Sequence, residues 1–150
     1  MQADLVSALR RQCPQIRARW KEILRAEPVS TPLANPDALV HLLDWSVEEI
    51  FRSLSMLASR RRTGHPEPPS DGPVCPCGRN PLLAYFAAGE QAVREALVLA
   101  QAAAAPLDPR ERDAALLELD EVLHMIAHRE IEAFCGVCQH RTAGTASASA

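Results

Sequence analysis

The sequence is poor in aromatic residues, with three Phe, two Trp and one Tyr in 150 residues. Sheet-based cores depend on aromatic and β-branched side chains, whereas the many Ala and Leu residues here suit helices packed on one another. No run of about 18 apolar residues predicts a transmembrane helix, and residues 1–12 lack the basic and apolar segments of a secretion signal. These absences favour an all-α, cytoplasmic protein that does not interact with membranes.

Positive charge is also scarce. The chain carries 16 Lys and Arg against 19 Asp and Glu, for a formal net charge of −3, and its only basic run is Arg60 to Arg62. A nucleic-acid partner requires a broad basic surface, so none is expected. The length suits one domain, which we place at residues 1–140. Residues 141–150 have nothing to bury and are predicted to form a disordered tail.

Apolar periodicity and start signals predict four helices. The first covers residues 3–26 and should kink or split at Pro14, because proline lacks a backbone donor and clashes with the preceding turn. The second should begin where Asn35 caps and Pro36 takes the first helical position. Its predicted buried stripe consists of Leu39, Leu42, Leu43, Ile50, Phe51, Leu54 and Leu57.

The third and fourth helices carry the clearest start signals. Asn80, followed by proline, should cap a helix that runs to about residue 105. Asp108 and Glu111 form a capping box for the fourth helix, and Gly136 is predicted to stop it in the left-handed conformation. Because a short connection joins these two helices, they should pack antiparallel. The expected fold is an antiparallel four-helix bundle.

Four of the five cysteines form two close pairs that this hairpin would bring together. Cys75 and Cys77 stand just before the third helix, and Cys135 and Cys138 stand at the end of the fourth. Each helix is about 25 residues, or roughly 37 Å, long, so the start of one should meet the end of the other. The fifth cysteine, Cys13, stands alone on an apolar face and reads as a small buried residue.

A structural Zn²⁺ ion explains this arrangement best. Four thiolates in tetrahedral geometry make a closed zinc site, and paired cysteines in a cytoplasmic protein more often bind metal than form disulfides. Gly78 permits the turn that the first pair needs, while Arg79 and Arg129 are near enough in sequence to offset the negative charge. His140 and His128 are substitute ligands, an iron–sulfur cluster could use the same cysteines, and unligated thiols or a redox pair are the simpler alternatives.

The histidines give a weaker signal. His124 and His128 lie four residues apart, at the edge of the apolar stripe of the fourth helix. Glu121 with His124 makes one Glu-x-x-His, but a di-iron bundle needs two, and "HMIAH" lacks the glutamate of a zinc protease. We therefore expect His124 and His128 to be residues at the edge of the core with polar partners rather than metal ligands. No catalytic residue is identified.

The stretches "IRARWKEILRAEP" and "LANPDALVHLLDWSVEEIF" resemble the start of the N-terminal sensory domain of RsbR-type stressosome and histidine-kinase proteins. The resemblance covers about the first 60 residues and includes Trp20 and the "NPDAL" lead into the second helix. It carries no functional residue across, and the cysteine pairs are not part of the family pattern. It implies a regulatory module rather than an enzyme.

Three functions follow, in order of preference. The first is a non-enzymatic sensor or adaptor, stabilised by a structural zinc site at the bundle end, that binds a protein partner or a second copy of itself. The second is a redox or metal sensor that releases zinc when the thiolates are oxidised. The third is a bundle that binds a small ligand or metal through His124 and His128.

Overall fold

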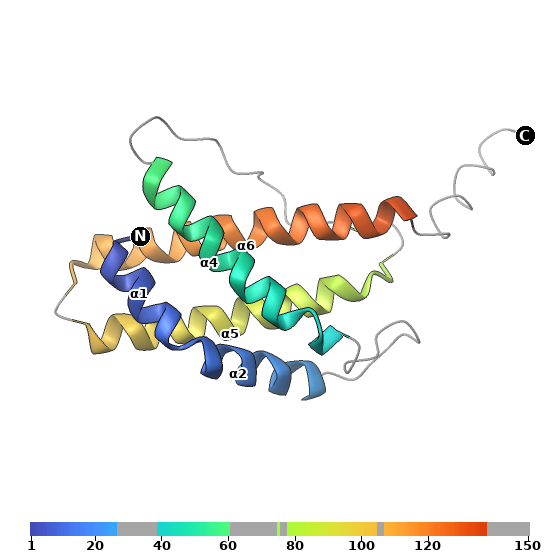
Figure 1. The fold of residues 1–150 in the computed structure, drawn as a ribbon, viewed down its shortest axis with the longest axis horizontal. Helices are drawn as coiled ribbons and strands as arrows, with labels where there is room; N and C mark the ends of the chain where they lie inside the picture. Colours follow the sequence, from blue (N-terminus) through green and yellow to red (C-terminus); the bar gives the residue numbers. More distant parts are fainter. Residues whose placement is uncertain (27–38, 61–74, 76–77, 105–106, 138–150) are drawn as a thin grey trace, which may run out of the picture.

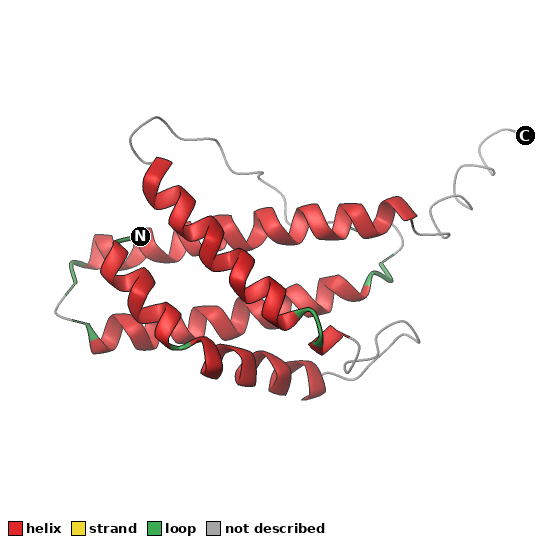
Figure 2. Ribbon diagram, in the orientation of Figure 1, coloured by secondary structure: helices red, strands yellow, loops and turns green. Residues whose placement is uncertain are grey.

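The computed structural model describes residues 1–26, 39–60, 75, 78–104 and 107–137. These residues form the helices α1 (Ala3–Arg11), α2 (Cys13–Ala26), α4 (Leu43–Arg60), α5 (Pro81–Ala103) and α6 (Pro109–Val137), and they contain no strand (Figures 1 and 2). The all-α prediction is confirmed. None of these helices combines the length and the apolar character that a membrane span needs. The expected cap Asn35 and the predicted tail, residues 141–150, lie outside the described residues.

The predicted break at Pro14 is confirmed. α1 ends at Arg11, the amide of Gln12 donates to the Leu9 carbonyl at 2.9 Å, and α2 begins at Cys13. Pro14 therefore occupies the second position of a new helix, where its missing amide hydrogen leaves no bond unmade. The direction of the chain changes between the two helices (Figure 1).

The second predicted helix is interrupted near its start. Residues 39–40 are helical, residues 41–42 form a turn in which the Leu42 amide donates to the Leu39 carbonyl, and α4 begins at Leu43. The prediction that Leu42 is buried is wrong: it lies in the turn directly before α4, and 39% of the residue is exposed. The four central residues of the predicted stripe, Leu43, Ile50, Phe51 and Leu54, are buried, and Leu39 and Leu57 are partly buried.

The predicted caps at the starts of the last two helices are confirmed. Asn80 Oδ1 accepts a hydrogen bond from the Leu82 amide at 3.0 Å. Asp108 Oδ1 accepts from the Arg110 amide at 2.8 Å, and the Asp108 amide donates to Glu111 Oε2 at 3.4 Å, which completes the capping box.

The predicted stop at Gly136 is wrong. α6 continues through Val137, and Gly136 does not adopt a positive φ. Glycine permits the left-handed conformation without enforcing it, so Gly136 can stay within the helix.

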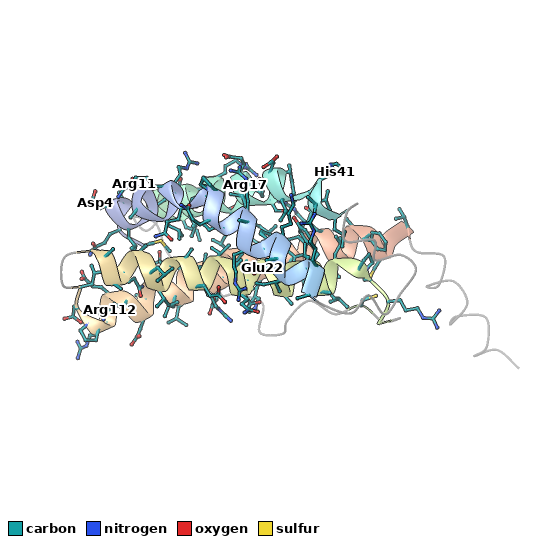
Figure 3. All side chains as sticks on the ribbon, turned by 90° about the horizontal axis from the view of Figure 1, so that it is seen from below. Asp4, Arg11, Arg17, Glu22, His41 and Arg112 are labelled. Carbon is teal, nitrogen blue, oxygen red and sulfur yellow. The ribbon has the colours of Figure 1, made fainter. Side chains whose placement is uncertain are left out.

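α5 and α6 lie side by side and antiparallel, as predicted, while α1 and α2 pack on α5 and α4 packs on α6 (Figure 1). In the view of Figure 3, α1 and α4 form one layer, and α5 and α6 form a second layer beneath it. The core between them is a single cluster of apolar side chains. The hairpin of α5 and α6 is therefore the frame against which the first half of the chain packs.

Tyr85 on α5 joins three helices at the centre of this core. Its backbone carbonyl accepts a hydrogen bond from Trp20 Nε1 on α2 at 2.9 Å, and its hydroxyl lies 2.8 Å from Ser46 Oγ on α4. The Trp20 and Tyr85 ring centroids are 4.8 Å apart. Trp20 also packs directly on the backbone of α5 at Gly89, where a side chain would collide with the indole. These contacts fix how α2 and α4 sit on the hairpin.

Candidate functional site

Two of the predicted metal ligands lie at the same end of the α5–α6 hairpin. Cys75 precedes α5 and is 8% exposed, and Cys135 lies in the last turn of α6 and is 7% exposed. Cys135 thus belongs to the helix rather than to the segment after it, because α6 extends past Gly136. The start of α5 and the end of α6 meet at this end of the molecule (Figure 1).

Asn80 bridges the two helices. While its Oδ1 caps α5, its Nδ2 donates to the Ile131 carbonyl at 3.2 Å and lies 3.4 Å from Cys135 Sγ, and the residue is only 4% exposed. The sequence predicted the cap but not the bridge. The available signal was the residue type, because a capping asparagine keeps an amide group with two donors, whereas an ionised aspartate has no donor.

Gly78, the predicted turn residue before α5, has the conformation that a sharp turn needs. The Gly78 amide donates to the Cys75 carbonyl at 3.0 Å, and Gly78 has a φ of 63°, a conformation that glycine adopts without strain. A hydrogen bond between residues three apart is the kind that closes a β-turn.

Only half of the predicted ligand set can be placed. Cys77, Cys138 and the substitute His140 lie outside the described residues. Within the described ranges, no group of three or more His, Cys, Asp or Glu side chains could hold a metal ion. The complete four-cysteine site, and the choice between zinc and an iron–sulfur cluster, therefore stay predictions.

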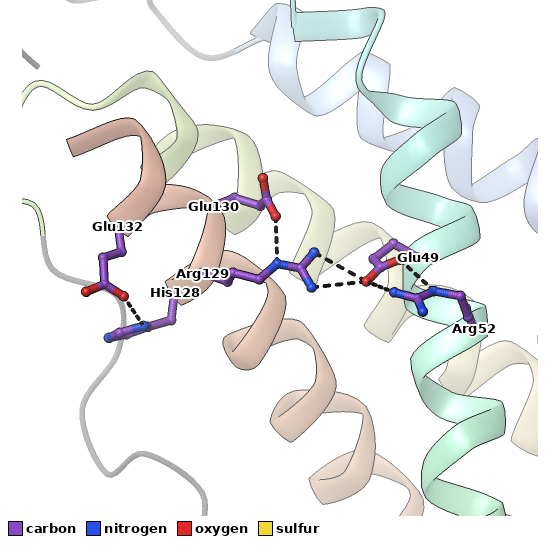
Figure 4. A network of polar contacts seen from close by, with 6 residues as sticks. All are labelled: Glu49, Arg52, His128, Arg129, Glu130 and Glu132. Atoms are coloured by element: carbon purple, nitrogen blue, oxygen red, sulfur yellow. Dashed lines mark hydrogen bonds and ion pairs between the residues drawn. The ribbon is translucent and has the colours of Figure 1, made fainter. Parts of the chain in front are cut away.

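The two helical histidines each lie near a carboxylate. His124 Nε2 lies 3.8 Å from Glu90 Oε2. His128 Nδ1 lies 3.8 Å from Glu132 Oε2 (Figure 4). Their side chains are 41% and 49% exposed. Both residues thus sit at the edge of the bundle with carboxylate neighbours, so this geometry gives no support to a ligand site inside the bundle.

Arg129, expected to offset the charge of the thiolates, instead joins an ion-pair network that links α6 to α4 (Figure 4). Its Nη1 and Nη2 each lie 3.3 Å from Glu49 Oε1, and its Nε donates to Glu130 at 2.8 Å. Arg52 donates to both oxygens of Glu49, at 2.6 and 2.9 Å. Because the described Arg129 contacts are these carboxylates, neutralisation of the cysteine end by Arg129 is not seen.

Glu49 is the centre of this network and only 8% of its side chain is exposed. The hydrogen bonds from Arg52, and then those from Arg129, hold the pKa of its carboxyl below the ordinary range despite burial. Sequence reasoning missed the network. The spacing of Glu49 and Arg52 indicated a pair on one helix, but nothing in the sequence connected either residue with α6.

No family model, no characterised protein and no solved structure matches the chain. The resemblance of its first part to the RsbR-type sensory domain accordingly stays a prediction.

Proposed function

We propose that the chain is a non-enzymatic regulatory module that acts by binding another protein and whose hairpin end is closed by Zn²⁺ on Cys75, Cys77, Cys135 and Cys138. In this proposal α1 and α2 count as one bent helix, so the whole is an antiparallel four-helix bundle. The observation that carries it is the burial of Cys75 and Cys135 at one end of the hairpin.

The residues at this end fit a zinc site. A zinc ion needs four deprotonated ligands within about 2.3 Å, so the chain must turn tightly at each cysteine pair. The hydrogen bond from Gly78 to Cys75 supplies such a turn at the first pair. At the second pair, Cys135 lies in the last turn of α6, and Cys138 follows Val137, the last residue of α6, in the sequence.

Asn80 supports the same conclusion from outside the ligand set. An amide that donates to a cysteine sulfur favours the thiolate and fixes its direction, which is the usual task of groups that surround structural metal sites. Bound zinc would supply cross-linking of the two helix ends, since a site with four protein ligands has no open position for a substrate. The remaining surface of the bundle is then left for partner recognition.

A thiol-based sensor is the second candidate. It is favoured by the position of Cys135 near the end of α6, where Val137, two residues further on, is 80% exposed. Oxidation of thiolates to disulfides by a peroxide-type oxidant would remove the ligands and release the metal. The zinc-sensor and structural-zinc proposals share one site and differ in whether oxidation changes the module.

Metal analysis of the chain, purified without added metal, tests the proposal. We expect one zinc per chain, retained in Cys13→Ser and lost in Cys75→Ser and Cys135→Ser. Cys13 is the matched control, because it is also a buried cysteine but lies on α2, far along the chain from the site. A reagent that reacts with thiols should modify the native chain slowly until a chelator is added.

Three other results would be informative. Iron in place of zinc, with visible absorbance, would assign the same cysteines to an iron–sulfur cluster. Zinc release by mild peroxide together with a change in helicity would favour the sensor. A metal-free chain whose cysteines at 75, 77, 135 and 138 react at once would refute the metal proposal.

A further inference from the structure

α4 has an outward face that none of the described helices covers, and Figure 1 shows this helix in front of α6. Four side chains follow one another along this face at helical spacing: Trp45, Glu48, Arg52 and Met56. Trp45 is 44% exposed and Met56 is 46% exposed, although both are large apolar residues. The four residues are called the α4 stripe below.

The α4 stripe lines a shallow groove together with Arg10 of α1. The guanidinium of Arg10 lies over the Phe51 ring, 5.4 Å from its centroid, and so forms one wall of the groove. Tryptophan, methionine and arginine are the residue types that protein interfaces favour over the rest of a surface. The composition of the groove therefore suits a protein partner.

The order of residues along the stripe identifies that partner. Read in one direction, the stripe is apolar, acidic, basic and apolar, and an antiparallel copy presents the complementary order. With a two-fold axis near residue 50, Trp45 of one copy faces Met56 of the other, and Glu48 faces Arg52. A two-fold interface requires a surface that complements itself in this way, and antiparallel helices also oppose their dipoles favourably.

Both charged residues are available for such pairing. The side chains of Glu48 and Arg52 are 66% and 62% exposed. Arg52 uses Nε and Nη2 for Glu49, so Nη1 can donate to a second acceptor. Among the described residues, Arg17 Nη2 lies 3.7 Å from Glu48 Oε1, which is a weak contact.

We propose that the groove above α4 binds a second copy of this chain, and that the two copies form an antiparallel, two-fold symmetric dimer through the α4 stripe. The charge order is the deciding observation, because an unrelated partner would not require the stripe to complement itself. This proposal rests on α4 and not on the cysteine end, so it stands or falls independently of zinc.

A charge swap tests the pairing directly. The full chain is studied by sedimentation over a range of concentrations, and wild type should dimerise. In a dimer of Glu48→Arg, the new arginine faces Arg52 of the other copy at both symmetry-related pairs. In a dimer of Arg52→Glu, the new glutamate faces Glu48 of the other copy at both pairs. Each variant should raise the dissociation constant about tenfold or more. An equimolar mixture of the two variants restores both ion pairs, so it should form a mixed dimer of near wild-type affinity.

The apolar part of the stripe has a matched control. Met56→Lys should weaken the dimer, whereas Met125→Lys on α6, where the methionine is equally exposed at 46%, should leave the dissociation constant unchanged. Both positions are exposed, and circular dichroism of each variant verifies the fold. This pair keeps the test valid if a charge-reversed variant proves unstable.

Tryptophan fluorescence reports occupancy of the groove. The chain has two tryptophans, and Trp20 is fully buried, so quenching by acrylamide reports mainly Trp45. Protection of Trp45 should increase with protein concentration. The proposal is overturned by a wild-type chain that stays monomeric with Trp45 shielded at every concentration, which would assign the groove to another segment of the same chain. A dimer insensitive to all stripe variants, or variants that do not complement each other, would overturn it as well.

Discussion

Substitution of Gly89 by alanine tests the central packing contact of the fold. A Cβ atom at this position would lie 2.5 Å from Trp20 Cη2 and 2.6 Å from Cε2, well inside van der Waals contact. In most helices the same change is stabilising by about 1 kcal/mol, because alanine has the higher helix propensity. Here the two effects oppose each other, so the sign of the result depends on whether the indole can move.

The indole has little freedom to move. Trp20 is fully buried, its Nε1 donates to the Tyr85 carbonyl at 2.9 Å, and its ring packs against that of Tyr85. Relieving the clash requires a shift of roughly 1 Å, which strains the core by about 1–3 kcal/mol and weakens a buried hydrogen bond by about 1 kcal/mol. After the gain in helix propensity, we expect Gly89→Ala to lower the free energy of unfolding by about 2 kcal/mol.

Urea unfolding monitored by circular dichroism measures this difference, and thermal unfolding should show a fall of about 4–8 °C in the melting temperature. Gly136→Ala is the control, because a Cβ there meets no atom within 4 Å in the last turn of α6; it should be neutral or slightly stabilising. If Gly89→Ala is as stable as wild type or more so, Trp20 does not pack on α5 as described.

Three further results are expected. Asn80→Ala should destabilise the chain by about 2–3 kcal/mol in urea unfolding and Asn80→Ser by less, because serine keeps the cap but loses the donor to Ile131; equal losses would show that the cap contributes nothing. The pKa of Glu49 is lower in the folded than in the unfolded chain, so its stabilising effect should be complete above about pH 5 and disappear as the pH falls through the folded pKa. Glu49→Gln should therefore make the free energy of unfolding less sensitive to acid. Identical pH profiles of the variant and wild type would exclude such a role. Burial raises the pKa of Tyr85 to about 12, although the hydrogen bond with Ser46 lowers it slightly. In an ultraviolet titration of the folded chain, the single tyrosine should therefore ionise well above pH 10. Ionisation near pH 10 would show that the phenol is exposed.

Features that depend on the chemistry of neighbouring residues were predictable. Pro14 breaks the first helix because its ring and missing donor act on the backbone beside it. Asn80 and Asp108 cap their helices because a short polar side chain reaches amides two or three residues away. The antiparallel hairpin followed from a short connection between two long helices.

Features that depend on which surfaces meet were not predictable. Leu42 has the character of a core residue but lies in the turn before α4 and is exposed. Gly136 could stop a helix, yet α6 passes through it. Arg129 was expected near the cysteines because they are close in sequence, but its long side chain reaches the carboxylate of Glu49 on α4 instead.

The sequence by itself therefore determined the helical class, most helix starts, the break at Pro14 and the hairpin that brings Cys75 and Cys135 to one end. Only the tertiary structure decided that Asn80 contacts Cys135, that Glu49 joins α4 to α6, and that the α4 stripe faces outward. The physical reason is the range of the forces involved. Caps and backbone clashes act within a few residues, whereas burial and ion pairing between helices depend on how whole elements fit together in space.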